Sequence, residues 1–551
     1  MSTAAYPATV STGRQSHAVA RLPAWWPLAA LTLLAAVLRL STLDLQSFWY
    51  DEAFTPVHVL HASLAATLRS VVHTENSPPL WYVLEWADAR LLGTGEVALR
   101  LPSALAGIAT VPVAWAIGRE VAYPPDSPPA RRAAILCAAL VAVNPLFVWY
   151  SQEARVYALF VLTGALAMLC FLRALREPTP RRMAAFALTA ALALLTHYFA
   201  VFLLAPMALW LLWDRRTRRA ALVAIGVLVV VGVALLPLIS AQGGHGTQWI
   251  GRWPLSERLQ AIPQYYLTGY TGSSLGHGIE LLVALPILAG IALGLWRMTG
   301  PAPGATLADP RPASDAQVTP KMPDAHASPG ARDRGAPISP ERGLTIALSL
   351  AACGVLIPVV LVAFGADYLA PRNLVAAMIP LTAAIAVLVV WPARGPGNAG
   401  SGATIVVAGA IVVAFLAISI DIELSPRLQR GNWRGLAAAL HVAPRERVIT
   451  TVELGTAPLE YYLPGLSGVR PGGFVRVREI DETGYQPLVA NAGAPPAPGF
   501  HLLSRVDIDG LIAYRFVSPV ARRVSESALR RHVITLASPA VLGPAGVQVS
   551  S

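Results

Sequence analysis

The chain has 551 residues, of which 55% are hydrophobic and only 13% carry a charge. A soluble domain has about 25% charged residues, so this composition excludes an ordinary soluble globular protein. The net charge of +11 could suggest a nucleic-acid-binding protein, but the arginines stand in short clusters between apolar segments. That placement is typical of the cytoplasmic loops of a membrane protein and argues against nucleic acid as a partner.

Long segments of the chain contain no Asp, Glu, Lys or Arg. They are 156–172, 183–213, 220–250, 343–366, 373–393 and 395–420. About 20 apolar residues are needed to cross the hydrocarbon core of a bilayer as a helix. The segments are rich in Leu, Ala and Val without two-residue alternation, which indicates helices. We expect spans at 23–42, 78–93, 99–118, 132–149, 154–174, 183–197, 199–213, 220–240, 277–296, 343–364, 372–391 and 403–420.

The arginine clusters predict the topology. Clusters at 131–132, 173–182 and 215–219 mark cytoplasmic loops, because cytoplasmic loops are enriched in Lys and Arg. A cytoplasmic start and an external tail need an odd number of crossings, whereas twelve segments qualify. We therefore expect about 11–13 spans. Either 78–93 or the short pair flanking His197 is expected to be re-entrant or broken; the alternative is that one further crossing exists. Such backbone is tolerated where it lines a protein cavity.

The domain organisation follows from the same patterns. We expect a cytoplasmic tail at 1–22, an N-terminal membrane module at 23–299, and the remaining membrane helices at 343–420. Residues 300–342 contain nine prolines and almost no large apolar residue, which predicts a disordered cytoplasmic linker.

The tail at 421–551 is expected to form a small extracytoplasmic α/β domain. Residues 432–441 predict a helix and residues 448–452 a strand. Residues 501–506 and 511–517 flank Asp509-Gly510, a dipeptide typical of a β-hairpin turn. The fold class is therefore an all-α polytopic membrane protein with a C-terminal α/β domain.

The segment Phe48-Trp49-Tyr50-Asp51-Glu52-Ala53 follows the first span. Two adjacent carboxylates repel each other, which raises the pKa of one of them and suits a general base. Aromatic residues also favour the membrane interface. On composition alone, a solvated interfacial loop is the simpler interpretation.

A second polar cluster joins two apolar segments without room for a loop. It contains Tyr150, Gln152, Glu153 and Arg155. Charged residues at membrane depth are costly and usually functional, and the planar guanidinium of Arg155 suits a phosphate. A buried Glu153–Arg155 pair that closes a helix junction is the alternative.

Three further positions are candidates for substrate binding. Ser77 and Tyr82 flank Pro78-Pro79, where the free N–H groups of a helix start could bind phosphate; a plain helix boundary is the alternative. His197 and Tyr198 lie in an uncharged stretch, where a histidine often only joins two helices by a hydrogen bond.

Arg372 follows Asp367-Tyr368-Leu369-Ala370-Pro371 between two apolar segments. It is a second candidate clamp for a phosphate, and an arginine that extends from a helix end to the interface is the alternative. On the predicted topology, Asp51, Arg155 and Arg372 all lie on the external face, which favours one shared cavity.

The chain resembles the C-type membrane glycosyltransferases in the motif order FWYDEA, NSPPLWYVLEW, RLPSALAG, YSQEARVYAL, THYFA and YLAPRN. The resemblance is closest to the bacterial family 39 group, which is related to protein O-mannosyltransferases and aminoarabinose–lipid A transferases. It covers roughly residues 23–390. Two positions depart from the family pattern: Ser77 stands where Lys or His is common, and Asn373 stands where Tyr is common.

The resemblance implies a GT-C helical bundle in a bacterial cytoplasmic membrane, with an extracytoplasmic active site. It implies an inverting enzyme that takes a sugar from a polyprenyl-phosphate donor and transfers it to an envelope glycan, lipid or protein. Asp51 would be the general base, Glu52 would position the acceptor, and Arg155 and Arg372 would hold the leaving phosphate. A divalent cation, Mg²⁺ or Mn²⁺, bound by Asp51 and Glu52 is a candidate cofactor.

A transporter or flippase of lipid-linked sugars is the alternative function. It would also explain charged residues at membrane depth. Such proteins often contain matching broken helices in two repeated halves, and no internal repeat is visible in this sequence.

Overall fold

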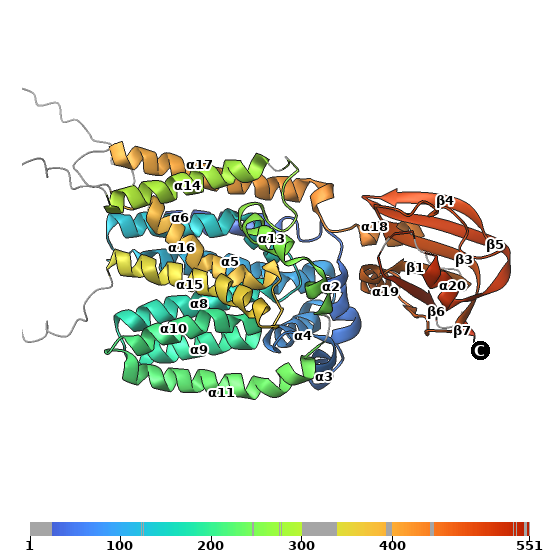
Figure 1. Ribbon diagram of the computed structural model, residues 1–551, viewed down its shortest axis with the longest axis horizontal. Coiled ribbons are helices and arrows are strands. Elements are labelled where there is room, and N and C mark those ends of the chain that lie inside the picture. The colour runs from blue at the N-terminus through green and yellow to red at the C-terminus, as the bar shows by residue number, and fades with distance from the viewer. Residues whose placement is uncertain are drawn as a thin grey trace, which may run out of the picture.

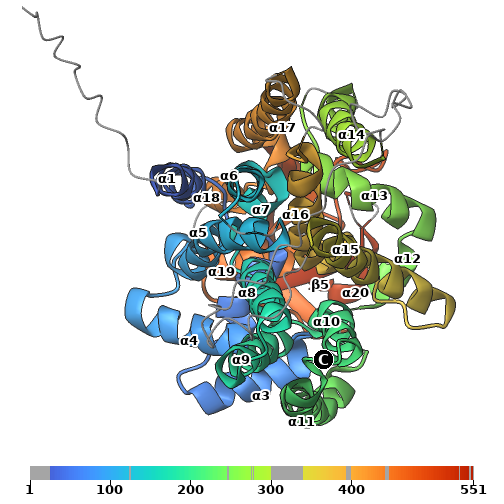
Figure 2. The same cartoon turned by 90° about the vertical axis from the view of Figure 1, so that its left-hand side faces the viewer.

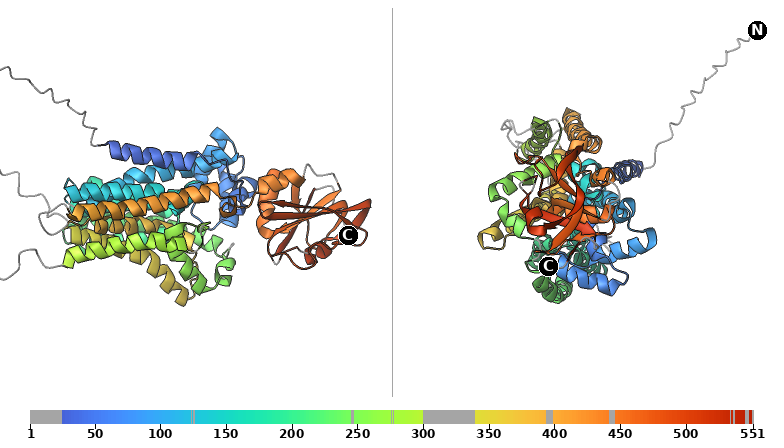
Figure 3. Two further views of the ribbon diagram at one scale, coloured as in Figure 1. Left: turned by 90° about the horizontal axis from the view of Figure 1, so that it is seen from above. Right: turned by 90° about the vertical axis from the view of Figure 1, so that its right-hand side faces the viewer.

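The computed structural model describes residues 25–299, 339–392, 399–440 and 446–549, apart from 123, 125, 245–246, 275, 277, 533, 536 and 545–547. The expected tail at 1–22 and almost all of the expected linker at 300–342 lie outside the described residues. The protein has two parts, a helical bundle and a smaller domain built around a β-sheet at one end of it (Figure 1). Helix α17 leads from the bundle toward that domain (Figure 3).

The helices that run along the axis of the bundle lie side by side (Figures 1 and 2). They are α1 (Trp26–Leu40), α5 (Glu96–Val121), α6 (Pro128–Val143), α8 (Tyr157–Arg176), α9 (Pro180–Thr196), α10 (Val201–Trp213), α11 (Arg218–Gln242), α14 (Gly278–Thr299), α15 (Pro340–Ala363), α16 (Met378–Val389) and α17 (Ala399–Leu424). Helix α5 packs against α6 and α8, and α8 packs against α9.

Short elements connect these helices. They are α2 (Tyr50–Phe54), the π-helical turn Thr55–Val59, α3 (Leu64–Thr74), α4 (Leu80–Leu92), α7 (Pro145–Ser151), α12 (Gln248–Arg252), α13 (Leu255–Thr268) and the 3-10 helices Tyr198–Ala200, Pro371–Ala377 and Pro426–Leu428. Helices α2, α3 and α4 lie at the end of the bundle that faces the β-sheet domain (Figure 1).

The outer helices expose apolar surface that only lipid can cover. In the most apolar window of α11, 11% of the residues are buried inside the protein, against 72% in α8. A soluble protein rarely exposes such a continuous apolar surface. The contrast places α8 at the centre of a membrane bundle and α11 at its lipid-facing periphery.

The number of spans is lower than predicted when it is judged by length and composition. Among the described residues, seven helices are long and apolar enough to cross a membrane, or eight if the bent pair α6–α7 is one span. By length and composition the described part of the structure has fewer spans than the predicted 11–13, because several of the predicted segments form helices too short to be counted. Helix α1 has 15 residues and α10 has 13.

The segment 78–93 is not a membrane span. It forms α4, a helix of 13 residues that lies beside α3 at the end of the bundle (Figure 1). A helix of that length is about 20 Å long and cannot cross a hydrocarbon core of about 30 Å. This segment was one of the two places where the sequence predicted a re-entrant or broken crossing.

The β-sheet domain contains α18 (Trp433–Leu440), the 3-10 helix Glu453–Gly455, α19 (Thr456–Tyr462), α20 (Glu526–Arg531), β1 (Arg447–Val452), β2 (Leu466–Gly468), β3 (Phe474–Tyr485), β4 (His501–Ile508), β5 (Leu511–Ser525), β6 (Pro539–Pro544) and β7 (Gln548–Val549). The strand order is β2-β6-β1-β3-β5-β4, and β7 pairs with β3. Strands β1 and β3 are parallel, and the other pairs are antiparallel.

The predicted elements of this domain are confirmed. The expected helix is α18, the expected strand is β1, and the expected hairpin is β4–β5. At its turn, Asp509 and Gly510 have φ angles of 51° and 91°. Positive φ at both central residues is what a two-residue type I′ turn requires, which explains the Asp-Gly dipeptide.

Candidate active site

Helix α2 carries the acidic pair and begins directly after the loop that follows α1. Asp51 and Glu52 stand in its first turn, where acidic residues interact favourably with the helix dipole. Successive residues on a helix point about 100° apart, so the two carboxylates diverge. The structure therefore gives the two members of the pair different partners.

Glu52 is a buried structural anchor. Its side chain is 0% exposed, and its two oxygens accept hydrogen bonds from Nε and Nη2 of Arg100, each at 2.8 Å. Oε1 also accepts the backbone N–H of Ala154 at 2.9 Å. Burial alone would raise the pKa of the Glu52 carboxyl, but Arg100 and Arg430 hold it below its usual value. The predicted rise in pKa from mutual repulsion is therefore not found at Glu52.

Arg100 also shapes the loop before α2. Its Nη1 donates to the carbonyls of Leu43 and Gln46, both at 2.7 Å, and its Nη2 donates to the carbonyl of Ser47 at 3.1 Å. Arg100 was not predicted as a site residue from the sequence, although it lies in the motif RLPSALAG. Its charge inside an expected membrane span was the signal that could have identified it.

Asp51 remains accessible. Its Oδ2 accepts a hydrogen bond from Nη1 of Arg372 at 2.9 Å, and its side chain is 19% exposed. Nη1 of Arg155 donates to the backbone carbonyl of Asp51 at 3.3 Å. The structure thus brings together the three residues that the sequence placed on one face.

Arg155 belongs to a second polar group. Its Nη2 lies 3.3 Å from Oε2 of Glu75, and the hydroxyl of Tyr82 donates to the same oxygen. Glu75 is 4% exposed and was not among the candidate residues. The alternative interpretation of Arg155, a structural pair with Glu153, is not what the structure contains.

Arg372 is the second residue of the 3-10 helix Pro371–Ala377. Its guanidinium lies 5.0 Å from the ring centre of Trp249 and 5.9 Å from that of Tyr157. Aromatic faces attract a guanidinium, and here they hold it against Asp51. The nearby Asp367 pairs instead with Arg258, at 2.5 Å and 2.9 Å.

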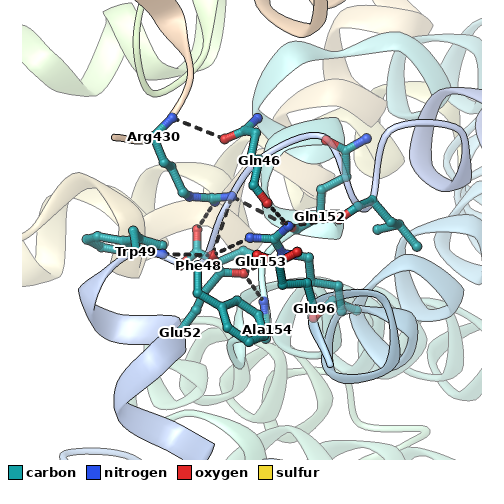
Figure 4. A network of polar contacts seen from close by, with 12 residues as sticks. Gln46, Phe48, Trp49, Glu52, Glu96, Gln152, Glu153, Ala154 and Arg430 are labelled. Atoms are coloured by element: carbon teal, nitrogen blue, oxygen red, sulfur yellow. Dashed lines mark hydrogen bonds and ion pairs between the residues drawn. The ribbon is translucent and has the colours of Figure 1, made fainter. Parts of the chain in front are cut away.

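Glu153 has a partner from a distant part of the chain. Its Oε2 accepts a hydrogen bond from Nη2 of Arg430 at 2.7 Å. Figure 4 shows Arg430 extending between Glu153 and Glu52, with Trp49 beside them. Burial raises the pKa of the Glu153 carboxyl to about 7, although Arg430 opposes this shift. The sequence contains no local signal that joins residues 153 and 430.

Gln152 and Tyr150, two further candidate residues, contact neighbouring parts of the bundle. The Gln152 amide donates to Leu38 O at 2.9 Å and to Thr42 Oγ1 at 2.6 Å, which fastens the turn to α1. Tyr150 is buried in α7, with its ring 4.6 Å from that of Tyr157. Gln152 therefore supports the turn, and its role in substrate binding stays a prediction.

Gln242 joins two of the remaining candidates. Its Nε2 donates to the carbonyl of Ser77 at 3.1 Å, and its Oε1 accepts the hydroxyl of Tyr198 at 2.7 Å. His197 accepts the backbone N–H of Phe199 on Nδ1 at 3.1 Å and stacks on Phe160 at 4.6 Å. The hydrogen bond is local and the stacking joins His197 to α8, so its role in substrate binding stays a prediction.

A divalent cation bound jointly by Asp51 and Glu52 does not fit this geometry. Arg100 and the Ala154 N–H occupy both oxygens of Glu52. Within the described part of the chain, no group of three or more His, Cys, Asp or Glu side chains could hold a metal ion. The acidic pair is therefore not the cation site that the sequence suggested.

Comparison with known proteins agrees with the fold. Residues 76–241 match the family model described as dolichyl-phosphate-mannose-protein mannosyltransferase. The structure is similar to that of ArnT from Cupriavidus metallidurans bound to undecaprenyl phosphate, with a TM-score of 0.50 and 13% identity over 90% of this chain and 98% of that chain. For apo ArnT, the TM-score is 0.51, with 12% identity over 89% and 97% of the two chains.

The predicted fold is confirmed. The chain is a multi-pass membrane protein with an ArnT-like fold, and the family resemblance agrees with the match at residues 76–241. The Saccharomyces cerevisiae Pmt1–Pmt2 complex bound to its sugar donor also matches, with a TM-score of 0.32 and 18% identity over 40% of this chain and 33% of that chain. No curated protein matches the sequence.

The segment matched by the family model contains Tyr82, Glu153 and Arg155 but not Asp51, Arg372 or Arg430. The roles of the latter three residues therefore depend on the geometry described above.

Proposed function

We propose that this protein transfers a sugar from a polyprenyl-phosphate donor to an acceptor on the extracytoplasmic side of the membrane, with inversion at the anomeric carbon. The observation that carries the proposal is the contact between Asp51 and Arg372 at 2.9 Å, with Arg155 at the backbone carbonyl of Asp51 at 3.3 Å. An accessible carboxylate beside two arginines matches the needs of glycosyl transfer to a hydroxyl, namely a base and a clamp for the leaving phosphate.

The reaction that fits this geometry is a single displacement. Asp51 accepts the proton of the acceptor hydroxyl, whose oxygen forms a bond to the anomeric carbon. The bond from that carbon to the lipid phosphate breaks, and the phosphate leaves with the electron pair. Attack opposite the leaving group inverts the anomeric configuration. Glu52 is unsuited to be the base because both of its oxygens are occupied and its side chain is 0% exposed.

Arg372 and Arg155 are suited to stabilise the leaving phosphate. A guanidinium donates two parallel hydrogen bonds to phosphate oxygens, and donors aimed at developing charge usually make the largest contribution to catalysis. Both arginines contact Asp51, Arg372 at the carboxylate and Arg155 at the backbone carbonyl. A phosphate that draws Arg372 away would leave the Asp51 carboxylate free to accept a proton.

The extracytoplasmic location is supported by the charge at the opposite ends of the helices. Glu120, near the end of α5, pairs with Arg173 and Arg176 near the end of α8. Asp214, after α10, pairs with Arg342 at the start of α15. These arginine-rich ends lie away from the β-sheet domain (Figure 1). Because arginines favour cytoplasmic loops, the site and the β-sheet domain are proposed to be extracytoplasmic.

The proposed donor class follows from the comparison. ArnT, which this chain matches over 98% of the ArnT length, has been solved with undecaprenyl phosphate. We propose the same lipid class here, in a bacterial cytoplasmic membrane, with an envelope glycan, lipid or protein as acceptor.

The decisive experiment compares Asp51→Asn with Asp44→Asn in membranes supplied with a polyprenyl-phosphate sugar. Asp44 is an exposed carboxylate in the same loop, so it is a matched control. The proposal predicts that Asp51→Asn inserts normally but releases no polyprenyl phosphate, while Asp44→Asn retains activity. Normal release by Asp51→Asn would contradict the base assignment. Movement of intact donor across the membrane without release of polyprenyl phosphate would favour the flippase.

A further inference from the structure

Arg430 is a buried cation that reaches the site from outside the membrane bundle. It lies in the connection between α17 and α18, after the 3-10 helix Pro426–Leu428, and its side chain is 5% exposed. Its guanidinium lies 4.3 Å from the ring centre of Trp149 and 5.9 Å from that of Trp49. Its backbone N–H donates to Oε1 of Gln46 at 3.1 Å.

Four carboxylates around the site each pair with an arginine, and Arg430 also lies 3.9 Å from the carboxylate of Glu52. The pairs are Asp51–Arg372, Glu52–Arg100, Glu75–Arg155 and Glu153–Arg430. The first three pairs lie wholly within residues 51–372. The fourth arginine comes from the connection to the β-sheet domain. Because an unpaired buried charge is costly, Arg430 opposes the rise in the pKa of Glu153 that burial causes.

Arg430 also holds the turn that precedes Arg155. Its Nη1 donates to the carbonyl of Gln152 at 3.4 Å, and its Nη2 binds the Glu153 carboxylate at 2.7 Å. The N–H of Ala154 is bound by Glu52 at 2.9 Å. Each of residues 152, 153 and 154 is thus held by a hydrogen bond from Arg430 or to Glu52. This turn leads directly into Arg155 and sets its position. Figure 4 shows these contacts converging on the turn.

We propose that Arg430 is a positioning residue for Arg155, which binds the donor phosphate. The connection to the β-sheet domain is therefore required for the geometry of the active site. The inference rests on the proposed function, since it assigns Arg155 to the donor phosphate. Arg430 acts through the turn 152–154 and needs no contact with either substrate.

A competing explanation is that Arg430 only fastens the β-sheet domain to the bundle. Arg434 provides the matched control because it fastens the same connection elsewhere. It pairs with Glu96 at 2.5 Å and donates to the carbonyl of Asp44 at 2.9 Å, and its side chain is 46% exposed. No recorded contact joins Arg434 to the turn 152–154 among the described residues. Loss of Arg434 tests docking without disturbing the carboxylates of the site.

The experiment measures initial rates of the full-length protein against donor and acceptor concentration for Arg430→Gln, Arg430→Lys and Arg434→Gln. Arg430→Gln is expected to raise the apparent KM for a polyprenyl-phosphate sugar at least about tenfold, with a smaller change in the KM for acceptor. Arg434→Gln is expected to leave both values close to those of the unaltered protein. Arg430→Lys keeps the charge but not the planar fork, so its donor KM is expected to be intermediate.

A double-variant cycle separates positioning from docking. If Arg430 acts through Glu153, then Arg430→Gln combined with Glu153→Gln loses no more activity than the worse single variant, whereas independent losses multiply. Arg434→Gln combined with Glu153→Gln is expected to show independent effects.

Equal behaviour of Arg430→Gln and Arg434→Gln, or multiplied losses in the first double variant, would overturn the inference. If Arg430→Gln does not accumulate in the membrane, a donor KM of Arg430→Lys equal to that of the unaltered protein would overturn it. Absence of sugar transfer by the unaltered protein would instead contradict the proposed function, and the inference with it.

Discussion

Glu52 accepts two hydrogen bonds of 2.8 Å from Arg100, and neither side chain is more than 1% exposed. Arg100 stands on α5 and Glu52 on α2, so the pair fixes the acidic helix to the bundle. The same guanidinium binds three carbonyls of the preceding loop. Asp51, one residue earlier, is thereby held where Arg372 can reach it.

Breaking this pair is predicted to destabilise the protein. Glu52→Ala leaves Arg100 buried without its carboxylate, and removing one partner of a buried ion pair costs about 3–5 kcal/mol. Thermal unfolding of the detergent-solubilised protein measures the loss. Asp51→Asn is the control, because Asp51 is 19% exposed and its loss is expected to affect activity more than stability. A melting temperature of Glu52→Ala equal to that of the unaltered protein would contradict the anchoring role.

Replacing Arg372 is predicted to impair the reaction without removing the fold. Arg372→Gln removes one donor to the leaving phosphate, which corresponds to a loss of about 10²–10³-fold in rate if it acts like other donors to developing charge. Arg427→Gln is the matched control, since Arg427 is an exposed arginine on the same side of the bundle. Release of polyprenyl phosphate measures both. Equal rates for the two variants would show that Arg372 does not hold the phosphate.

Close packing of α5 on α6 predicts intolerance to a methyl group at Gly118. A Cβ atom there would lie 2.8 Å from the carbonyl oxygen of Ala133 and 2.9 Å from Cα of Ala134. Backbone atoms cannot yield as a side chain does, and overpacking costs about 1–3 kcal/mol. Gly118→Ala is therefore expected to lower the melting temperature. Gly232→Ala in α11, where nothing lies within 4 Å of the added Cβ, is expected to be neutral or slightly stabilising.

The β-sheet domain is predicted to lose stability as the pH rises from 7 to 9. Burial raises the pKa of the Glu482 carboxyl to about 9, from an ordinary value of 4.5. In that range the carboxyl is neutral when folded and ionised when unfolded, so the unfolded state holds fewer protons. The free energy of unfolding then falls by about 1.4 kcal/mol per pH unit from this group.

The neutral carboxyl of Glu482 can donate to Nδ1 of His532, which lies 2.8 Å away. Burial lowers the pKa of His532, so His532 is neutral above pH 7 and adds no slope there. Glu482→Gln keeps a donor for Nδ1 and is expected to flatten the dependence of the melting temperature on pH between 7 and 9. Asp507→Asn, at a carboxylate that is 48% exposed, is the control. An unchanged slope in Glu482→Gln would contradict the prediction.

The amino-acid sequence by itself determined which parts of the chain enter the membrane and which form the β-sheet domain. Both depend on local composition, because a bilayer needs a continuous apolar helix and a two-residue hairpin needs residues that accept positive φ. The resemblance to family 39 also depended on short motifs. The weak candidate at 78–93, where Glu85 and Asp88 interrupt the apolar pattern, forms the 13-residue helix α4.

Only the tertiary structure decided how the charged residues pair. The sequence presented Asp51 and Glu52 as one acidic pair, whereas the fold assigns Asp51 to Arg372 and buries Glu52 on Arg100. Arg430 lies 277 positions after Glu153 in the chain, and no periodicity or motif connects them. The physical reason is that a buried charge is stabilised by whichever opposite charge the packing brings within hydrogen-bond distance, and that choice is made by the arrangement of α2, α5 and the connection after α17.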